Sequence, residues 1–316
     1  MEGLATLTIL KVLNSNRFSG AEIVLTFFAL VLVQQATAAD NDDSPATTNS
    51  WTPQNSRFGL FGWLDHRSGY YQDSFPQALT VDDTSLEPGG ELELTYLHTA
   101  AGWQHSDQMS AELQKSIGLV TFELEVPYQR LFEPDGMAKG VGNIELHARC
   151  PFYQYVSDQA FFDDTLGVIG GVGIPVYSPV SRNTELEGGL FNDAKLGRHF
   201  TLQTILEYDQ LFGEGDEGGA EEFDYGVVLG WSVSHEELPI PGIAKLTPLL
   251  ELDGDLGLNL DEAGQNSLLG SLGFRADFCS VLGLEPSLAL SYVFPMSSAA
   301  RDEVHWGIAT NVTIGF

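Results

Sequence analysis

The sequence predicts an all-β protein, a single antiparallel β-barrel of about twelve strands that spans a membrane. Three observations support this fold class: an export-type N-terminus, apolar and polar residues that alternate in many segments, and an aromatic residue at the end of the final strand. In residues 305–316 the large apolar side chains all stand at even positions: Trp306, Ile308, Val312, Ile314 and Phe316. A period of two indicates a strand with one apolar and one polar face.

Residues 1–39 have the pattern of a secretory signal peptide. Lys11 and Arg17 precede an apolar run at 23–33, and residues 36–39 offer small side chains for cleavage. The run is shorter than the roughly 20 residues that a membrane-spanning helix needs. We therefore expect export and cleavage rather than a retained anchor helix.

The chain is strongly acidic, with a formal net charge of −30. This charge argues against nucleic acid as a partner, because phosphate backbones bind basic surfaces. Cys150 and Cys279 are the only two cysteines, which is too few for a disulfide framework in a chain of 316 residues. Cys150 falls on an apolar-face position, where an isolated thiol acts as a small apolar group.

Residues 40–88 form a predicted N-terminal extension on the periplasmic side. The polar stretch 40–56 has too little apolar content to build a core, so disorder is expected there. Residues 57–88 contain several aromatic side chains, among them Trp63 and Phe75, without clear periodicity. They either dock on the rest of the protein or plug it, and the sequence leaves that choice open.

Residues 89–316 form the predicted barrel. The alternating segments within this range are long enough to be tilted membrane-spanning strands, which need about 9–11 residues. The alternation is clearest in strands such as Phe122–Val126 and Phe223–Val233, and weakest in the second and sixth. The expected strands are 89–98, 107–115, 118–131, 141–154, 164–176, 185–194, 199–209, 222–234, 246–259, 267–278, 284–294 and 305–316.

An even strand count places both termini in the periplasm. The acidic, glycine-rich stretch 213–219 then falls in an outer loop. Prolines within the strands stand within the first or last few residues of each one, as a barrel without edge strands requires. The expected outer loops are 99–106, 132–140, 177–184, 210–221, 260–266 and 295–304.

Aromatic residues on the apolar face gather at the strand ends, which predicts two girdles at the height of the lipid headgroups. The expected outer girdle contains Tyr96, Tyr208, Phe223, Tyr225, Tyr292, Phe294 and Trp306. The expected inner girdle contains Phe152, Phe200, Trp231, Phe278 and Phe316.

The opposite face is rich in ionisable residues, and in a barrel it lines the lumen. Confined like charges disfavour ionisation, so protons or cations are expected to neutralise part of this set. The positive residues expected on this face are Arg149 and Arg275, with His147 and His305. The expected lumen carboxylates are Glu91, Glu93, Glu123, Glu125, Glu145, Glu207, Asp209, Asp224, Glu251, Asp253, Asp255, Asp277 and Glu285.

The sequence contains no recognisable catalytic constellation. It has no G-x-S-x-G elbow, no H-E-x-x-H metal motif and no Ser–His pair on the apolar face of the clear strands. His235 lies in a predicted periplasmic turn, and the glycines of 167–173 alternate within a strand. We therefore predict no enzyme activity, no cofactor and no metal centre.

The strand patterns resemble outer-membrane transporters of the MetA-pathway-of-phenol-degradation family. The resemblance covers about residues 89–316 and is carried by Glu91–Tyr96, Phe122–Tyr128, Gly140–Leu146 and Gly173–Pro175. Asn143 stands where the family usually has an Asp. The resemblance implies an outer-membrane barrel and uptake of hydrophobic or aromatic compounds, and it carries no catalytic residues.

These features together predict a porin-like channel in a bacterial outer membrane, with an acidic lumen and passive passage of small or hydrophobic solutes. The expected partners are outer-membrane lipid and the barrel-assembly machinery, which would bind the strand ending at Phe316; divalent cations are candidates at the acidic loops. The chief alternative is a secreted, acidic all-β binding or adhesion protein. An outer-membrane lipid hydrolase is a third reading with less support.

Overall fold

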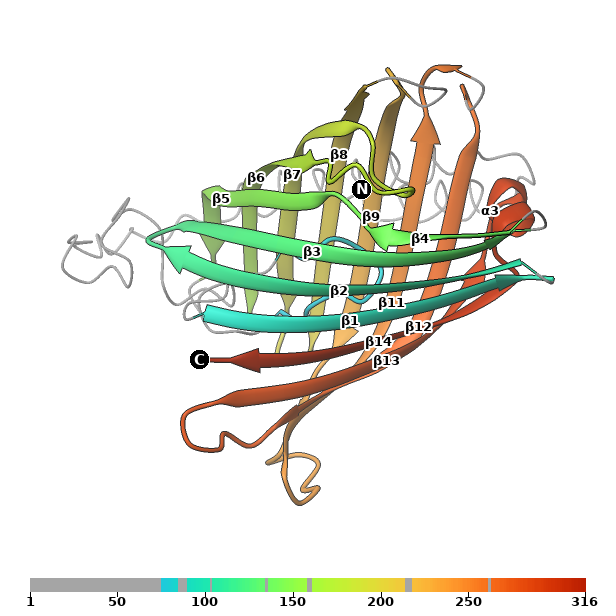
Figure 1. Cartoon of the computed structure of the whole chain (residues 1–316). Helices are drawn as coiled ribbons and strands as arrows, with labels where there is room; N and C mark the ends of the chain where they lie inside the picture. The colour runs from blue at the N-terminus through green and yellow to red at the C-terminus, as the bar shows by residue number, and fades with distance from the viewer. Residues whose placement is uncertain are drawn as a thin grey trace, which may run out of the picture. The chain divides into compact units, whose positions relative to one another are not determined.

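The computed structural model describes residues 75–84, 90–102, 104–133, 136–157, 161–213, 218–260 and 263–316. Twelve long antiparallel strands close into one barrel (Figure 1). They are β1 (Gly90–Ala101), β2 (Gln104–Ile117), β3 (Val120–Glu133), β5 (Ile144–Val156), β6 (Phe162–Ile174), β7 (Thr184–Leu196), β8 (Phe200–Phe212), β9 (Glu221–Trp231), β11 (Ile243–Gly257), β12 (Asn266–Phe278), β13 (Glu285–Pro295) and β14 (Trp306–Gly315). The predicted signal peptide and the predicted disorder at 40–56 lie outside the described residues.

Each long strand pairs with its neighbours in the sequence, and β14 pairs with β1 to close the ring. Leu92 stands opposite Ile314, and Gly90 and Phe316 exchange two backbone hydrogen bonds of 2.9 and 2.8 Å. The predicted fold class is confirmed. The two segments with the weakest alternation are full strands, β2 and β7, and both are longer than predicted.

Two connections contain structure that the sequence analysis did not anticipate. The loop predicted at 295–304 contains a short helix, α3 (Ser298–Glu303), whose first turn is capped by the Ser297 hydroxyl accepting from Ala300 N at 3.1 Å. The loop predicted at 132–140 contains β4 (Gly136–Val141), which continues the sheet by pairing with β3. A two-residue strand, β10 (Val233–Ser234), pairs with β11. Below, the α3 end of the barrel is the end that carries these first two connections, and the opposite end is the Phe316 end.

Three of the prolines inside strands lie where the hydrogen-bond ladder on one side of the strand is interrupted. Pro127 stands in the middle of β3, not near its end as predicted, at the point where the partner of β3 changes from β5 to β4. Pro248 lies where the partner of β11 changes from β10 to β9. Pro151 borders a bulge between β5 and β6. Because proline donates no backbone hydrogen bond, these breaks accommodate it without an unpaired position.

The two faces of the barrel have inverted polarity relative to a soluble protein. Outward leucines are exposed, with Leu94 at 50% and Leu272 at 61%, whereas the inward side chains of Gln114 and Glu251 are fully buried. A soluble sandwich would bury its apolar face, so this arrangement is that of a transmembrane barrel. Among the described residues, no helix is long and apolar enough to cross a membrane.

The predicted girdle residues lie on the outward face, and most of them are exposed. The exposed members are Tyr208, Tyr292, Trp306, Phe152, Phe200, Trp231, Phe278 and Phe316, and the half-buried ones are Tyr96, Phe223 and Phe294. Tyr225 differs, with 5% exposure. Its ring lies over Gly254, where an added Cβ would come within 2.3 Å of the ring, and its hydroxyl donates to Asn266 at 2.8 Å.

Candidate functional site: the barrel lumen

The carboxylates predicted for the lumen lie on the inward face of the strands. The buried members of the predicted set are Glu91, Glu93, Arg149, Glu207, Asp209, Glu251 and Arg275. The half-buried members are Glu123, Glu125, Glu145, His147, Asp224, Asp253 and Asp277, and the exposed ones are Asp255 and Glu285. Asp255 and Glu285 lie close to the ends of β11 and β13, so they belong to the two mouths.

Further charged residues outside the predicted set also face the lumen. They are Glu112, Asp163, Glu185, Glu187, Asp193, Lys195, Glu222 and Lys245, identified by register with predicted lumen residues or with each other. Most of them stand on β2 and β7, the strands with weak alternation. The sequence does indicate two of them: Glu185 and Glu187 are two residues apart, and this spacing places both side chains on one face of a strand.

Residues 75–84, here called the lumen segment, run inside the barrel, where Figure 1 draws them in cyan behind β1 to β3. One end is fixed through the side chain of Gln77. Its amide nitrogen donates to Glu91 on β1, and its carbonyl oxygen accepts from Arg275 on β12 and from Thr313 on β14, the last at 3.0 Å. The lumen segment is therefore part of the candidate site. Of residues 57–88 of the predicted extension, residues 75–84 lie inside the barrel.

The centre of the lumen segment is bound by Glu251 of β11. The Glu251 carboxylate accepts from the backbone amides of Leu79 and Thr80, both at 2.9 Å, and from the Thr80 hydroxyl at 2.6 Å. Ser271 donates to the same carboxylate at 3.2 Å. Glu251 therefore anchors backbone, and it is not a freely available charge in the lumen.

The far end of the segment reaches β5, β7 and β8. The Thr84 hydroxyl donates to Asp193 at 2.5 Å and accepts from Gln203 at 3.1 Å. Arg149 donates to the carbonyl oxygen of Asp83 at 2.5 Å and lies 3.3 Å from its carboxylate. With the contacts of Gln77 and Glu251, the segment crosses the lumen from β1 and β14 to the opposite wall.

An apolar patch inside the barrel also holds the lumen segment. Phe75, Ala78 and Val81 of the segment belong to one buried cluster with inward residues of the wall, namely Ile169, Phe191, Ile205, Val228 and Leu249. Gly226 leaves the space that Val81 fills, because an added Cβ would come within 2.1 Å of Val81 Cγ1. In the sequence, this inward apolar patch is indicated by pairs of adjacent apolar residues, such as Val227–Val228 and Leu249–Leu250. Each pair breaks the alternation, so one of its two side chains points inward.

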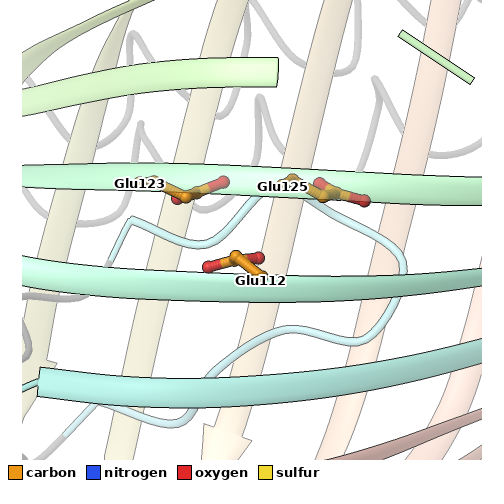
Figure 2. A group of neighbouring side chains, drawn as sticks. All are labelled: Glu112, Glu123 and Glu125. Carbon is orange, nitrogen blue, oxygen red and sulfur yellow. The ribbon is translucent and has the colours of Figure 1, made fainter. Parts of the chain in front are cut away.

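Three glutamates form a compact group on the wall of β2 and β3 (Figure 2). Glu112, Glu123 and Glu125 each offer an oxygen, and these atoms lie within 4.8 Å of one another. Glu123 already has basic neighbours, with Arg149 at 3.2 Å and His147 at 3.3 Å. His147 also lies 2.6 Å from Glu187 on β7. The positive charge of Arg149 is thus shared between the acidic wall and the lumen segment.

Positive residues collect at the Phe316 end. A cavity of about 490 Å³ there is lined by Lys195, Arg198, His199 and Lys245, together with two glutamates of the turn after β10. A second cavity of about 360 Å³ is lined by Gln77, Glu91, Arg275 and Asp277 among others. The carboxylates of β7, β8 and β9 closer to the α3 end, such as Glu185, Asp209 and Asp224, have fewer basic neighbours among the described residues. The lumen charge is therefore uneven along its length.

No known protein-family model matches this chain, and no curated protein matches it. Among solved structures, it is similar to an outer membrane channel from Pseudomonas putida F1, with 14% identity over 76% of this chain and 99% of that one, at a TM-score of 0.49. It is also similar to the NanC porin, with 6% identity over 71% of this chain and 98% of that one, at a TM-score of 0.45. The identities are too low to transfer residue roles, and the resemblance to the phenol-degradation family stays a prediction.

Proposed function

We propose that this protein is an outer-membrane channel of a two-membrane bacterium that passes small solutes and favours cations. The observation that carries the proposal is the wall of inward carboxylates in a barrel whose outward face is apolar. Rings of Asp and Glu concentrate cations in a narrow pore and repel anions. The excess of carboxylates over Lys and Arg along the inward face gives the sign of the expected selectivity.

The apolar outward face argues against the alternative of a secreted binding protein. Large apolar side chains are exposed all around the wall, among them Leu113, Val168, Leu190 and Leu290. Soluble proteins seldom expose continuous apolar patches of this extent, because such patches aggregate in water. Insertion of the barrel into lipid keeps these apolar side chains out of water.

The lumen segment narrows the channel. It leaves solvent-accessible space beside it, since Asp82 is exposed even though it lies among Glu207, Glu187 and His147 of the wall. Passage would therefore follow the acidic side of the lumen between the segment and the strands β5 to β9. Uptake of hydrophobic or aromatic compounds, implied by the family resemblance, remains a candidate for the transported class.

The test is a measurement of ion selectivity in planar bilayers with the purified full-length protein. A KCl gradient should give a reversal potential of the sign expected for K⁺ permeation. The double variant D253N/D255N should reduce that potential, whereas D302N on the exposed face of α3 should leave it unchanged. Anion selectivity of the native protein would refute the proposal. Heat-modifiable migration on an unboiled gel would separately establish that each variant is a folded barrel.

A further inference from the structure

The outward face of the barrel carries one row of ionisable side chains near the α3 end. His98 of β1 stands opposite Asp107 of β2, Asp107 opposite Arg130 of β3, and Arg130 opposite Lys139 of β4. Directly opposed residues share a face of the sheet, and His98 has the parity of the exposed Leu92 and Leu94. These four residues, here called the ionic row, therefore point outward.

The same row turns apolar on the neighbouring strands. Continuing in register from His98, it meets Ile308 on β14, Tyr292 on β13 and Leu272 on β12. All three are exposed to the outside. The ionic row therefore ends at β1 and does not continue onto β14, β13 or β12.

Aromatic side chains border the ionic row on both sides. Towards the α3 end, His105 stacks on Phe132 with ring centroids 3.9 Å apart, and Trp306 lies 5.3 Å from the ring of His98. Towards the middle of the barrel stand Tyr96 and Tyr128, and the next row is apolar, with Leu94, Ala111 and Val126. Aromatic belts mark the headgroup level of a membrane barrel, so the ionic row lies at the boundary between hydrocarbon and headgroups.

The positive charges of the ionic row exceed its negative charge. Asp107 is the only carboxylate in it and is shared: it accepts from Tyr96 and contacts His98, each at 2.9 Å, and lies 3.6 Å from Arg130. Among the residues that the structure describes, Lys139 has no carboxylate partner. Like charges directly opposite each other on a sheet destabilise it, and Asp107 balances only one of the two, so a further anion would stabilise the pair Arg130–Lys139.

We propose that the ionic row binds the phosphate of an anionic lipid in the leaflet at the α3 end. Arg130, of which 39% is exposed, and Lys139 would donate to phosphate oxygens, as guanidinium and ammonium groups do. Trp306 and Phe132 would pack against the lipid beside the headgroup. The binding rests on the barrel spanning a membrane and is independent of whether the lumen conducts ions.

The test uses the full-length protein in detergent, with phosphatidic acid and phosphatidylcholine as probes and native mass spectrometry as the readout. The native protein should retain phosphatidic acid in preference to phosphatidylcholine. The variant R130Q/K139Q should bind phosphatidic acid about tenfold more weakly, the loss expected for one to two charge-assisted contacts. Lys115, exposed on the same outer wall near the Phe316 end, provides the matched control K115Q.

The variant D107N separates lipid binding from a purely structural role. It removes the competing carboxylate, so phosphatidic acid should bind more tightly, whereas loss of a structural ion pair would only lower stability. Equal losses in K115Q and R130Q/K139Q, weaker binding in D107N, or no preference for phosphatidic acid in the native protein would each overturn the proposal. Displacement of the lipid by millimolar inorganic phosphate would assign the row to free phosphate and overturn it too.

Discussion

Glu251 and Thr80 are joined by two hydrogen bonds, from the backbone amide of Thr80 at 2.9 Å and from its hydroxyl at 2.6 Å. They lie 171 residues apart in the sequence, and the contact ties the lumen segment to the wall at β11. Carboxylates that accept from backbone amides form strong, charge-assisted hydrogen bonds. The carboxylate of Glu251 is therefore a fixed part of the barrel wall.

Replacing Glu251 should release the lumen segment. E251Q keeps the size of the side chain but presents amide hydrogens to donors, so we expect a loss of about 1–3 kcal/mol in unfolding free energy and a larger single-channel conductance. D253N, two residues along the same strand, should alter selectivity without changing thermal stability. If E251Q unfolds and conducts like the native protein, the segment is not held by this contact.

The fit of Val81 against Gly226 should be sensitive to a single methyl group. G226A places a Cβ 2.1 Å from Val81 Cγ1, so we expect destabilisation of about 1–3 kcal/mol from overpacking. When V81A is combined with G226A, much of this destabilisation should disappear, and a double-mutant cycle measures the resulting coupling energy. G188A is the matched control, because nothing lies within 4 Å of a Cβ at Gly188. Additive effects in the cycle would contradict the contact.

The assignment of outward and inward faces can be tested with arginine. Leu252 and Leu229 point outward, and L252R or L229R should cost about 2–4 kcal/mol if they face the middle of the bilayer. D253R places the same charge in the lumen beside carboxylates and should be tolerated. Folding stability in lipid vesicles is the measurement, and equal stability of L252R and D253R would refute the assignment.

The closing strand should be needed for assembly. Phe316 is exposed on the outward face, its backbone exchanges two hydrogen bonds with Gly90, and its ring fills the space beside Gly90. F316D introduces a charge at the edge of the apolar wall, so we expect membrane levels to fall, as quantified by immunoblot of membrane fractions. F316Y keeps the ring and should assemble normally. Native levels of F316D would count against the barrel in a membrane.

Cation preference should depend on pH and salt. Protonation removes the charge of the lumen carboxylates, so the K⁺ preference should weaken as the solution is acidified, and screening should weaken it as salt is raised. Reversal potentials measured between neutral pH and about pH 4, near the ordinary carboxyl range, test this. The D253N/D255N variant should show a smaller change over that range, and a preference that strengthens in acid would contradict the acidic-lumen model.

The sequence by itself determined the strands and their faces. A period of two is a local property, so Leu92, Leu94 and their counterparts could be assigned to one face without knowledge of any partner. The even number of strands and the position of the glycine-rich stretch likewise fixed the expected topology. Even β2 and β7, whose alternation is weak, were predicted correctly, because the chain between the clear strands on either side of each has the length of a single strand.

Only the tertiary structure decided what occupies the lumen and what gathers outside it. Residues 75–84 have no periodicity of their own, and their conformation depends on Glu251, Arg149 and an apolar patch that comes from five different strands. The ionic row likewise needs the register of four strands to bring His98 beside Asp107 and Arg130 beside Lys139. Contacts between residues distant in sequence are set by register and closure, which a local pattern does not encode.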